Sequence, residues 1–251
     1  LELSAIVNDF REKAEAAWIF TSASLSVKYN FSHFTDRMGL DDAKTLQLDS
    51  PFDYQYNALM WLPDQVPEPR DIDFVPALLE QGVPVLKARR GRAFLLVTSH
   101  RSLRKAAELL ADRVSYPLFV QGSQPRSLLL EQFRDSGQGV LLGSASFWEG
   151  VDVIGDALSL VVIDKLPFAA PDDPVMEARS HALRRSGGNP FTQHYLPHAV
   201  MALKHGAGRL IRDVTDRGVL VVCDPRIRTK SYGKVFLESL PPMKQAASRT
   251  E

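Results

Sequence analysis

The sequence predicts an α/β fold in which a doubly wound parallel sheet carries helices on both faces. Short apolar runs rich in Val, Ile and Leu alternate with helical patterns from residue 92 onward. Continuous apolar runs are typical of parallel strands covered on both sides, and strand–helix alternation is typical of a doubly wound sheet. The 45% apolar content of the 251 residues is ordinary for a globular protein with a sizeable core.

The predicted elements follow one another along the chain. Apolar spacing indicates a helix over 1–17, a short buried strand at 18–20 and a second helix at 31–40. Four prolines make 45–70 the best candidate for an extended linker. Beyond it, strands are expected at 93–98, 118–121, 139–143, 158–164 and 219–223, and helices at 74–86 (interrupted near Gly82 and Pro84), 101–113, 125–134, 173–186, 196–204 and 208–214.

Charge and cysteine content exclude several classes of protein. Lys+Arg and Asp+Glu number 30 each, so no global field attracts a polyanion, and any nucleic-acid contact must come from local basic patches. The candidates are 87–92, 101–105 and 226–230, although each also fits a solvated face. Cys223 is the single cysteine, which excludes a disulfide framework and a cysteine metal site within these residues.

Targeting signals are missing from the sequence. No signal peptide or membrane span is visible, which favours a cytoplasmic location and no membrane partner. The chain opens on Leu1 directly in a helical pattern, so we expect a piece of a longer polypeptide.

The peptide from His205 to Arg212 is the most informative stretch. Arg209 and Arg212, three residues apart on a predicted helix entered through Gly206 and Gly208, would form a fork for phosphate oxygens. On this peptide alone, a surface helix with two solvated arginines is an equal alternative.

Polar peptides also follow several predicted strands. Thr98-Ser99 follows the strand at 93–98, a Gly- and Ser-rich peptide from 143 to 152 follows another, and Asp164-Lys165 follows a third. Ligands of doubly wound sheets bind beyond the carboxyl ends of the strands. Small hydroxyl residues there can donate to phosphate oxygens, so we expect these peptides and the arginine-bearing peptide 205–212 to share one ligand-bearing edge.

Taken together, these peptides resemble the DinG/YoaA branch of the XPD-like superfamily 2 DNA helicases. The resemblance extends from Trp18 to Pro242, and 146–152 with 164–168 and 171–174 are its most specific parts. It implies two RecA-like domains that clamp ATP and move along single-stranded DNA. Residues 1–69 would be the last elements of the first motor domain plus a linker, and 70–251 the second RecA-like domain.

The resemblance also implies a role for each matching residue. Catalytic arginine fingers are implied at Arg209 and Arg212, nucleotide binding at Glu149, Gly150, Asp152 and Gly208, DNA binding at Thr98 and Ser99, and coupling of hydrolysis to domain movement at Thr21 and Ser22. His205 stands where the family usually has Gln, so no role is assigned to it.

Some parts of such a motor are missing from this sequence. It contains no Gly-x-x-x-x-Gly-Lys-[Ser/Thr] phosphate loop and no Asp-Glu-Ala-His-like magnesium motif. ATP and Mg²⁺ would therefore be shared with an upstream RecA-like domain of the same polypeptide, and these residues alone are expected to be inactive. The family's iron–sulfur cluster, if present, would also lie upstream. The expected partner is single-stranded or forked DNA, in DNA repair or replication.

Other functions remain open at this point. The chain could be a non-catalytic nucleic-acid or protein-binding module on a RecA-like scaffold, or belong to a relative whose partner domain is a nuclease. His194 and His198, four residues apart, have the spacing of a zinc pair, but no third ligand is evident nearby.

Overall fold

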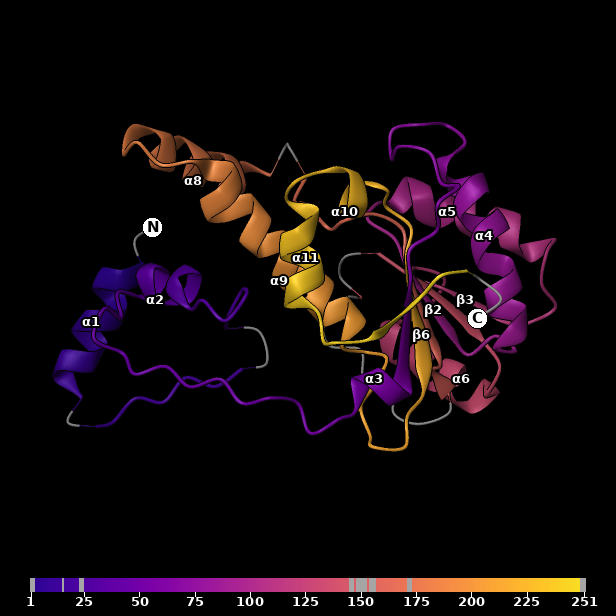
Figure 1. The fold of residues 1–251 in the computed structure, drawn as a ribbon, viewed down its shortest axis with the longest axis horizontal. Helices are drawn as coiled ribbons and strands as arrows, with labels where there is room; N and C mark the ends of the chain where they lie inside the picture. Colours follow the sequence, from indigo (N-terminus) through magenta and orange to yellow (C-terminus); the bar gives the residue numbers. More distant parts are fainter. Residues whose placement is uncertain are drawn as a thin grey trace. The chain divides into compact units, whose positions relative to one another are not determined.

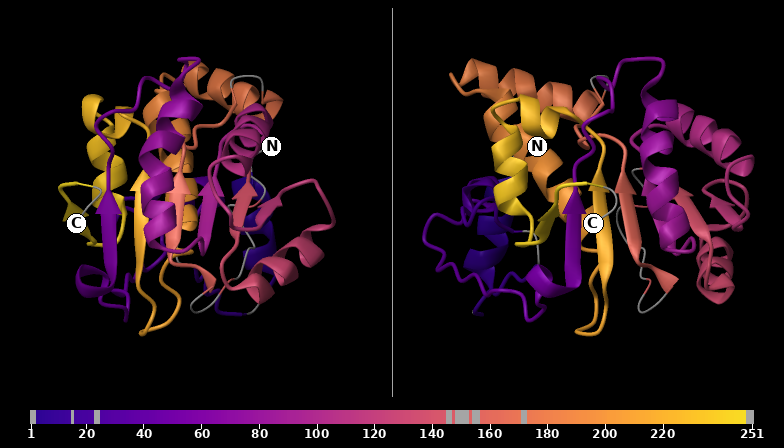
Figure 2. Two further views of the ribbon diagram at one scale, coloured as in Figure 1. Left: turned by 90° about the vertical axis from the view of Figure 1, so that its right-hand side faces the viewer. Right: turned by 45° about the vertical axis from the view of Figure 1, so that its right-hand side comes forward.

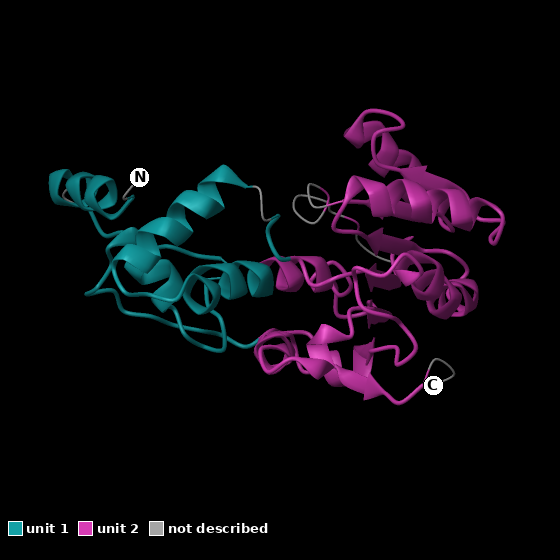
Figure 3. Ribbon diagram, turned by 90° about the horizontal axis from the view of Figure 1, so that it is seen from above, with its two compact units in different colours: residues 1–49, 168–201 teal, residues 50–167, 202–251 magenta. Residues whose placement is uncertain are grey.

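The computed structural model of the protein describes residues 3–14, 16–22, 25–144, 147, 153, 157–170 and 173–248. Two compact units emerge: unit 1 holds residues 1–49 and 168–201, and unit 2 holds 50–167 and 202–251 (Figure 3). The helices are α1 (Leu3–Lys13), α2 (Ser32–Met38), α3 (Tyr54–Asn57), α4 (Phe74–Ala88), α5 (His100–Ala111), α6 (Arg126–Ser136), α8 (Pro174–Arg185), the π-helix η2 (Phe191–Tyr195), α9 (Leu196–Ala207), α10 (Arg226–Thr229) and α11 (Gly233–Ser239). The strands are β1 (Ala58–Trp61), β2 (Ala93–Leu96), β3 (Leu118–Val120), β4 (Val140–Gly143), β5 (Leu160–Ile163), β6 (Gly218–Val222) and β7 (Lys244–Ala246).

Unit 2 is built on a seven-stranded sheet in the order β3-β4-β2-β5-β6-β1-β7 (Figure 1). Every pairing is parallel, and the arrows in Figure 2 point the same way. The carboxyl ends of the strands therefore share one edge of the sheet, the carboxyl edge, and their amino ends share the opposite one, the amino edge. This arrangement confirms the predicted parallel α/β sheet.

Helices cover both faces of this sheet. Alternate strand residues such as Leu95 and Val162 pack with Phe74 of α4 and Leu103 of α5 in one buried cluster. The helix α11 lies on the other side of the sheet (Figure 1), and its Phe236 is fully buried. Strand side chains point alternately to the two faces, so a sheet covered twice requires the continuous apolar runs seen in the sequence.

The predicted linker over 45–70 is wrong in its second half. Residues 58–61 form β1, which pairs with both β6 and β7 inside the sheet. The prolines flank this apolar run and do not interrupt it, so they leave its ladder hydrogen bonds intact. The assignment of 1–69 to a first motor domain remains a prediction.

Two further predictions differ from the structure. Residues 18–20 form no strand, and Trp18 and Ile19 are 47% and 84% exposed, because no described strand pairs with this short apolar run. The helix expected to break near Gly82 continues to Ala88 with Pro84 inside it. Burial of Phe74, Leu78 and Leu86 along one side of α4 offsets the missing backbone donor of the proline.

Within unit 1, α1 packs against the end of α2. Gly39 ends α2 with a left-handed φ of 67°, and a Cβ there would lie 2.8 Å from the Cβ of Ser4. The ion pair between Arg11 and Asp42, at 3.1 Å, joins the same two segments. Glycine is thus required here both for its conformation and for the close approach.

Candidate functional site

The predicted DNA-binding residues Thr98 and Ser99 lie directly after β2, at the carboxyl edge of the sheet. Ser99 is the N-cap of α5, where its Oγ accepts a hydrogen bond from the backbone N–H of Ser102 at 3.1 Å. The Thr98 hydroxyl donates to Asp164 at 3.4 Å. Both side chains are half-buried and have internal partners, so they fix the geometry of the peptide that enters α5.

The first turns of α5 make this part of the edge basic. His100, Arg101, Arg104 and Lys105 are all exposed. The positive end of the α5 dipole points the same way, because the helix begins at this edge. The predicted patch 101–105 is thus placed where an anion can approach.

The other two predicted basic patches are largely engaged in internal contacts. In 87–92, Arg89 donates to Ser159 at 3.2 Å, and Arg92 donates to the backbone of Arg89 at 3.0 Å. In 226–230, Arg226 pairs with Asp224, and Arg228 pairs with Asp64. Carboxylates therefore offset the charges of Arg226 and Arg228, which weakens 226–230 as an anion-binding surface.

Two buried carboxylates occupy the middle of the carboxyl edge. Asp164 follows β5, is fully buried and accepts the backbone N–H of Lys165 at 2.6 Å. Its burial raises the pKa of its carboxyl group to about 7. Asp224 follows β6, accepts the backbone N–H of Leu166 at 2.8 Å and forms an ion pair with Arg226 at 2.6 Å.

This pair of aspartates also acts on neighbouring groups. Burial raises the pKa of the Cys223 thiol, and the charges of Asp164 and Asp224 raise it further. The hydrogen bond to Asp224 raises the pKa of the Arg226 guanidinium. Sequence reasoning missed both aspartates as structural centres, although each is an acidic residue that directly follows a buried strand.

The arginine peptide lies at the opposite edge from the one expected. It directly precedes β6, whose first residue, Gly218, pairs with Ala58, the first residue of β1. Asn57, just before β1, donates to the backbone of Val214 at 3.1 Å. The peptide therefore sits at the amino edge, away from Thr98 and Ser99 at the carboxyl edge.

The predicted arginine helix over 208–214 is also wrong. The helix α9 ends at Ala207, and the N–H of Gly208 still donates to Lys204 at 2.8 Å. A single turn follows, in which Leu210 donates to the carbonyl of Ala207 at 3.1 Å. Gly206 lies in the last turn of α9 and Gly208 directly after it, so these glycines mark the end of a helix and not its start.

The structure fixes the backbone of this peptide firmly. Leu210 and Ile211 are 1% and 2% exposed, and Arg209 and Arg212 on either side of them are half-buried. The buried Asp216 carboxylate accepts the backbone N–H of Arg212 at 2.7 Å. The buried side chains of Leu210 and Ile211 and the hydrogen bond to Asp216 therefore fix the backbone from which the two guanidinium groups extend.

The structure does not relate the remaining predicted site residues to the sheet. Glu149, Gly150 and Asp152 lie outside the described residues. Thr21 and Ser22 are exposed in an irregular segment of unit 1.

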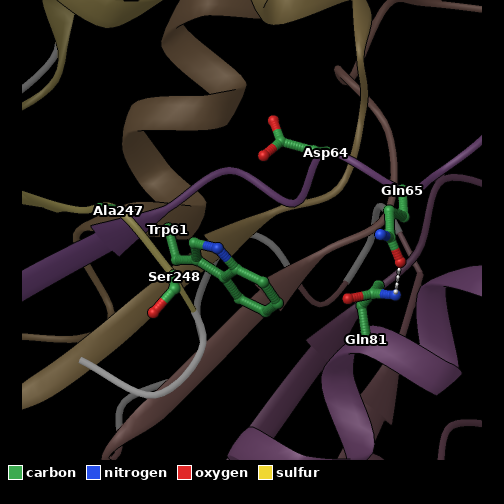
Figure 4. Close-up of a pocket in the computed structure, with 6 residues that line it drawn as sticks. All are labelled: Trp61, Asp64, Gln65, Gln81, Ala247 and Ser248. Atoms are coloured by element: carbon green, nitrogen blue, oxygen red, sulfur yellow. Dashed lines mark hydrogen bonds between the residues drawn. The ribbon is translucent and has the colours of Figure 1, made fainter.

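Beyond the last strand residues of β1 and β7 lies a hollow lined by none of the predicted residues (Figure 4). Its lining consists of Trp61, Asp64, Gln65, Gln81, Ala247 and Ser248. Gln81 of α4 donates to Gln65 at 3.5 Å across it. The carboxylate of Asp64 forms an ion pair with Arg228. The other polar groups that line the hollow are mainly the side-chain amides of Gln65 and Gln81.

Metal and membrane sites find no support in the described part of the chain. None of its His, Cys, Asp and Glu side chains gather in threes or more with the geometry of a metal site. None of its helices combines the length and apolar character needed to cross a bilayer.

Comparison with known proteins identifies the family. The sequence profile of the helicase C-terminal domain family matches residues 83–243, which include β2 to β6. The chain belongs to the helicase C-terminal domain family. The family resemblance carried by the sequence motifs is thereby confirmed.

Relatives of this helicase domain are longer than the chain. It is 46% identical over 241 residues to the ATP-dependent DNA helicase YoaA of Escherichia coli, covering 95% of this chain and 38% of that protein. It is 37% identical over 242 residues to the ATP-dependent helicase DinG of Mycobacterium tuberculosis, covering 95% of this chain and 36% of that protein. The chain thus spans little more than a third of the length of these relatives.

The fold of this helicase domain has solved counterparts. The S. tokodaii Xpd4 structure matches with a TM-score of 0.56 at 16% identity, covering 84% of this chain and 43% of that one. This likeness concerns the fold alone, and it confirms the RecA-like α/β architecture.

Proposed function

We propose that the chain is the C-terminal motor domain of an ATP-dependent DNA helicase, in which Arg209 and Arg212 contact the phosphates of ATP. The observation that carries the proposal is the peptide between α9 and β6, where two half-buried arginines flank two buried anchors in a helicase-family domain. Guanidinium groups held in this way stabilise the charge that develops during phosphoryl transfer. The names of the relatives, ATP-dependent DNA helicases, support the same activity.

The proposal requires ATP and Mg²⁺, shared with a preceding RecA-like domain. The described residues suit only the phosphate-contacting part of such a site, because they supply cations and no metal-binding group. Bound ATP supplies the phosphoryl group, and the two arginines orient it and stabilise its charge. Gly208, Glu149, Gly150 and Asp152 complete the nucleotide-binding set of the proposal. An iron–sulfur cluster does not fit this chain, whose one cysteine is buried.

Single-stranded or forked DNA is the proposed substrate, at the carboxyl edge. Thr98 and Ser99 position the backbone there, and the exposed basic turns of α5 supply charge for phosphates. Nucleotide and DNA would then bind at opposite edges of one sheet, so that a shift of the sheet moves both. Thr21 and Ser22 would couple the two events, in a cytoplasmic protein of DNA repair.

The test is ATP turnover by the full-length protein with single-stranded DNA. Arg209→Ala and Arg212→Ala should each lower turnover by about a thousandfold, the usual cost of losing an arginine finger. Arg217→Ala is the matched control: Arg217 lies in the same loop and stacks over the ring of Tyr56 at 4.7 Å. Equal turnover in all three variants would refute the proposal. The 251-residue chain alone should hydrolyse no ATP, and measurable hydrolysis would refute the need for a second domain.

A further inference from the structure

Unit 1 gathers two arginine and three histidine side chains, here named the His–Arg cluster. They are His33 and Arg37 of α2, Arg179 of α8, His194 of η2 and His198 of α9. Burial lowers the pKa of His194 to about 4, and positive charges of the other four lower it too. Burial and the charge of Arg179 likewise lower the pKa of Arg37. The members on α2 are far in sequence from those on α8, η2 and α9, so tertiary structure alone brings the five side chains together.

The cluster runs from the interior of unit 1 to its surface. His194 is 6% exposed, His33 and Arg179 are half-buried, and Arg37 and His198 are exposed. A ligand at the surface would therefore meet Arg37 first. Asp36 is the carboxylate that acts on His33, and it points to solvent as an exposed residue of the same helix.

A π-helical turn positions His194. Asn189 accepts the backbone N–H of Phe191 at 2.9 Å where the turn begins. The buried Ser180 hydroxyl of α8 lies 3.1 Å from the hydroxyl of Tyr195, where the turn ends. π-Helical turns are rare and frequent at functional sites, since they rotate side chains out of the regular helical register.

His194 keeps an unused polar atom inside the cluster. Its buried Nε2 has no hydrogen-bond partner among the residues that the structure describes. Buried polar atoms are normally satisfied, so an orphan atom in a cluster with two guanidiniums points to a ligand. A metal ion does not suit the site: two guanidiniums repel it, and the described histidines form no metal-binding group. An anion suits both the charge and the geometry.

Two aromatic rings adjoin the same turn. Phe191, the first residue of η2, stacks on Phe168 with ring centroids 5.9 Å apart and planes 28° from parallel. Phe191 is 38% exposed, so part of its ring reaches solvent. Cations beside exposed aromatic rings are the combination with which proteins bind single strands, through phosphates and bases respectively.

We propose that unit 1 is a separate binding site for single-stranded DNA, in which the His–Arg cluster holds a backbone phosphate and Phe191 stacks on a neighbouring base. Arg37 and Arg179 form charge-assisted hydrogen bonds with the phosphate, and His194 donates from below. The inference rests on the proposed helicase function, because it is that function which brings single-stranded DNA to the chain.

The test is fluorescence anisotropy of a labelled oligothymidine with the full-length protein over a range of salt concentrations. Arg37→Glu should weaken binding and make the slope of log affinity against log salt shallower by about 0.7, the value for one phosphate contact on a single strand. The matched control is Arg184→Glu, the same charge change at an exposed position on α8. Equal binding curves for the two variants would overturn the proposal.

A second pair of variants tests the aromatic half. Phe191→Ala should weaken binding about tenfold with the salt slope unchanged, because stacking releases no counterions. Phe191→Trp should restore it. Unchanged affinity in Phe191→Ala would overturn this half of the proposal.

Measurement of ATP affinity distinguishes a DNA phosphate from an ATP phosphate as the ligand of the His–Arg cluster. ATP affinity should be the same in Arg37→Glu and wild type, and a loss of ATP affinity with intact DNA affinity would overturn the proposal. Failure of the helicase proposal looks different: wild-type protein would then lack DNA-stimulated ATP turnover, whatever the cluster variants do.

Discussion

The hydroxyl of Thr98 donates to a carboxylate oxygen of Asp164 at 3.4 Å, joining the peptide after β2 to the peptide after β5. This contact ties the proposed DNA-binding peptide to the buried centre of the carboxyl edge. It also ties the peptide to a titratable group, because burial raises the pKa of Asp164 from 3.8 to about 7.

Asp164 should make the stability of the chain depend on pH. Between pH 4 and 7 the unfolded chain loses the Asp164 proton while the folded chain keeps it, so rising pH favours unfolding. The contribution to the free energy of unfolding should fall by as much as about 1.4 kcal/mol per pH unit and level off above pH 7. Urea unfolding of wild type and Asp164→Asn at pH 5 and pH 8 measures it. The variant should lack this share of the pH dependence, and the same pH dependence in both proteins would contradict the assignment.

Gly218 should be intolerant of a side chain. A Cβ at this position would lie 2.3 Å from Cδ1 of Leu210 and 2.9 Å from the carbonyl oxygen of Ser159. Gly218→Ala should therefore lower the free energy of unfolding by about 1–3 kcal/mol, as overpacking does. The same substitution at Gly82, inside α4 with nothing within 4 Å of its Cβ position, should raise it by about 0.5–1 kcal/mol. Chemical denaturation measures both, and the same sign for both would contradict this packing.

The ion pair between Arg226 and Asp224 should contribute more to the free energy of unfolding than the ion pair between Arg228 and Asp64. Arg226 contacts Asp224, whose side chain is fully buried, whereas Arg228 contacts Asp64, whose side chain is 77% exposed. At pH 7, Arg226→Ala leaves a buried carboxylate without its cation and should cost about 3–5 kcal/mol. Arg228→Ala should cost less than about 1 kcal/mol, as exposed pairs do. Thermal or urea unfolding compares the two, and equal losses would contradict the burial difference.

The strands were predictable because their chemistry is local. β2, β4, β5 and β6 are continuous apolar runs, and such runs need no knowledge of the fold to be recognised. β1 was missed because prolines on both sides made it look like part of a linker, and its membership in the sheet depends on partners distant in sequence.

The candidate site was predictable residue by residue but not in its arrangement. The family motifs named Thr98, Ser99, Arg209 and Arg212, yet sequence could not show that the hydroxyls and the arginines lie at opposite edges. The Gly-x-Gly peptide fits the start and the end of a helix equally well, and the hydrogen bond from the N–H of Gly208 to the carbonyl of Lys204 decides between them. His33 and Arg179 are brought together only by tertiary structure, so no sequence pattern predicts the His–Arg cluster.

Asp216 should control the position of Arg212 without touching a nucleotide. Its carboxylate accepts the backbone N–H groups of Arg212 at 2.7 Å and of Asp213 at 2.8 Å, and it is 9% exposed. Asp216→Leu removes the carboxylate oxygen that accepts both N–H groups, which should cost about 1–3 kcal/mol of stability. In the full-length protein it should also lower kcat for ATP more than it raises KM, because Arg212 acts on the transition state.

Asp216→Asn retains an acceptor oxygen and should restore most of the activity, which a purely electrostatic role would not allow. Asp213→Ala, at an exposed neighbour that accepts the hydroxyl of Thr215 at 2.7 Å, is the control and should leave kcat unchanged. A kcat for Asp216→Leu equal to that of Asp213→Ala would show that this carboxylate does not position the arginine.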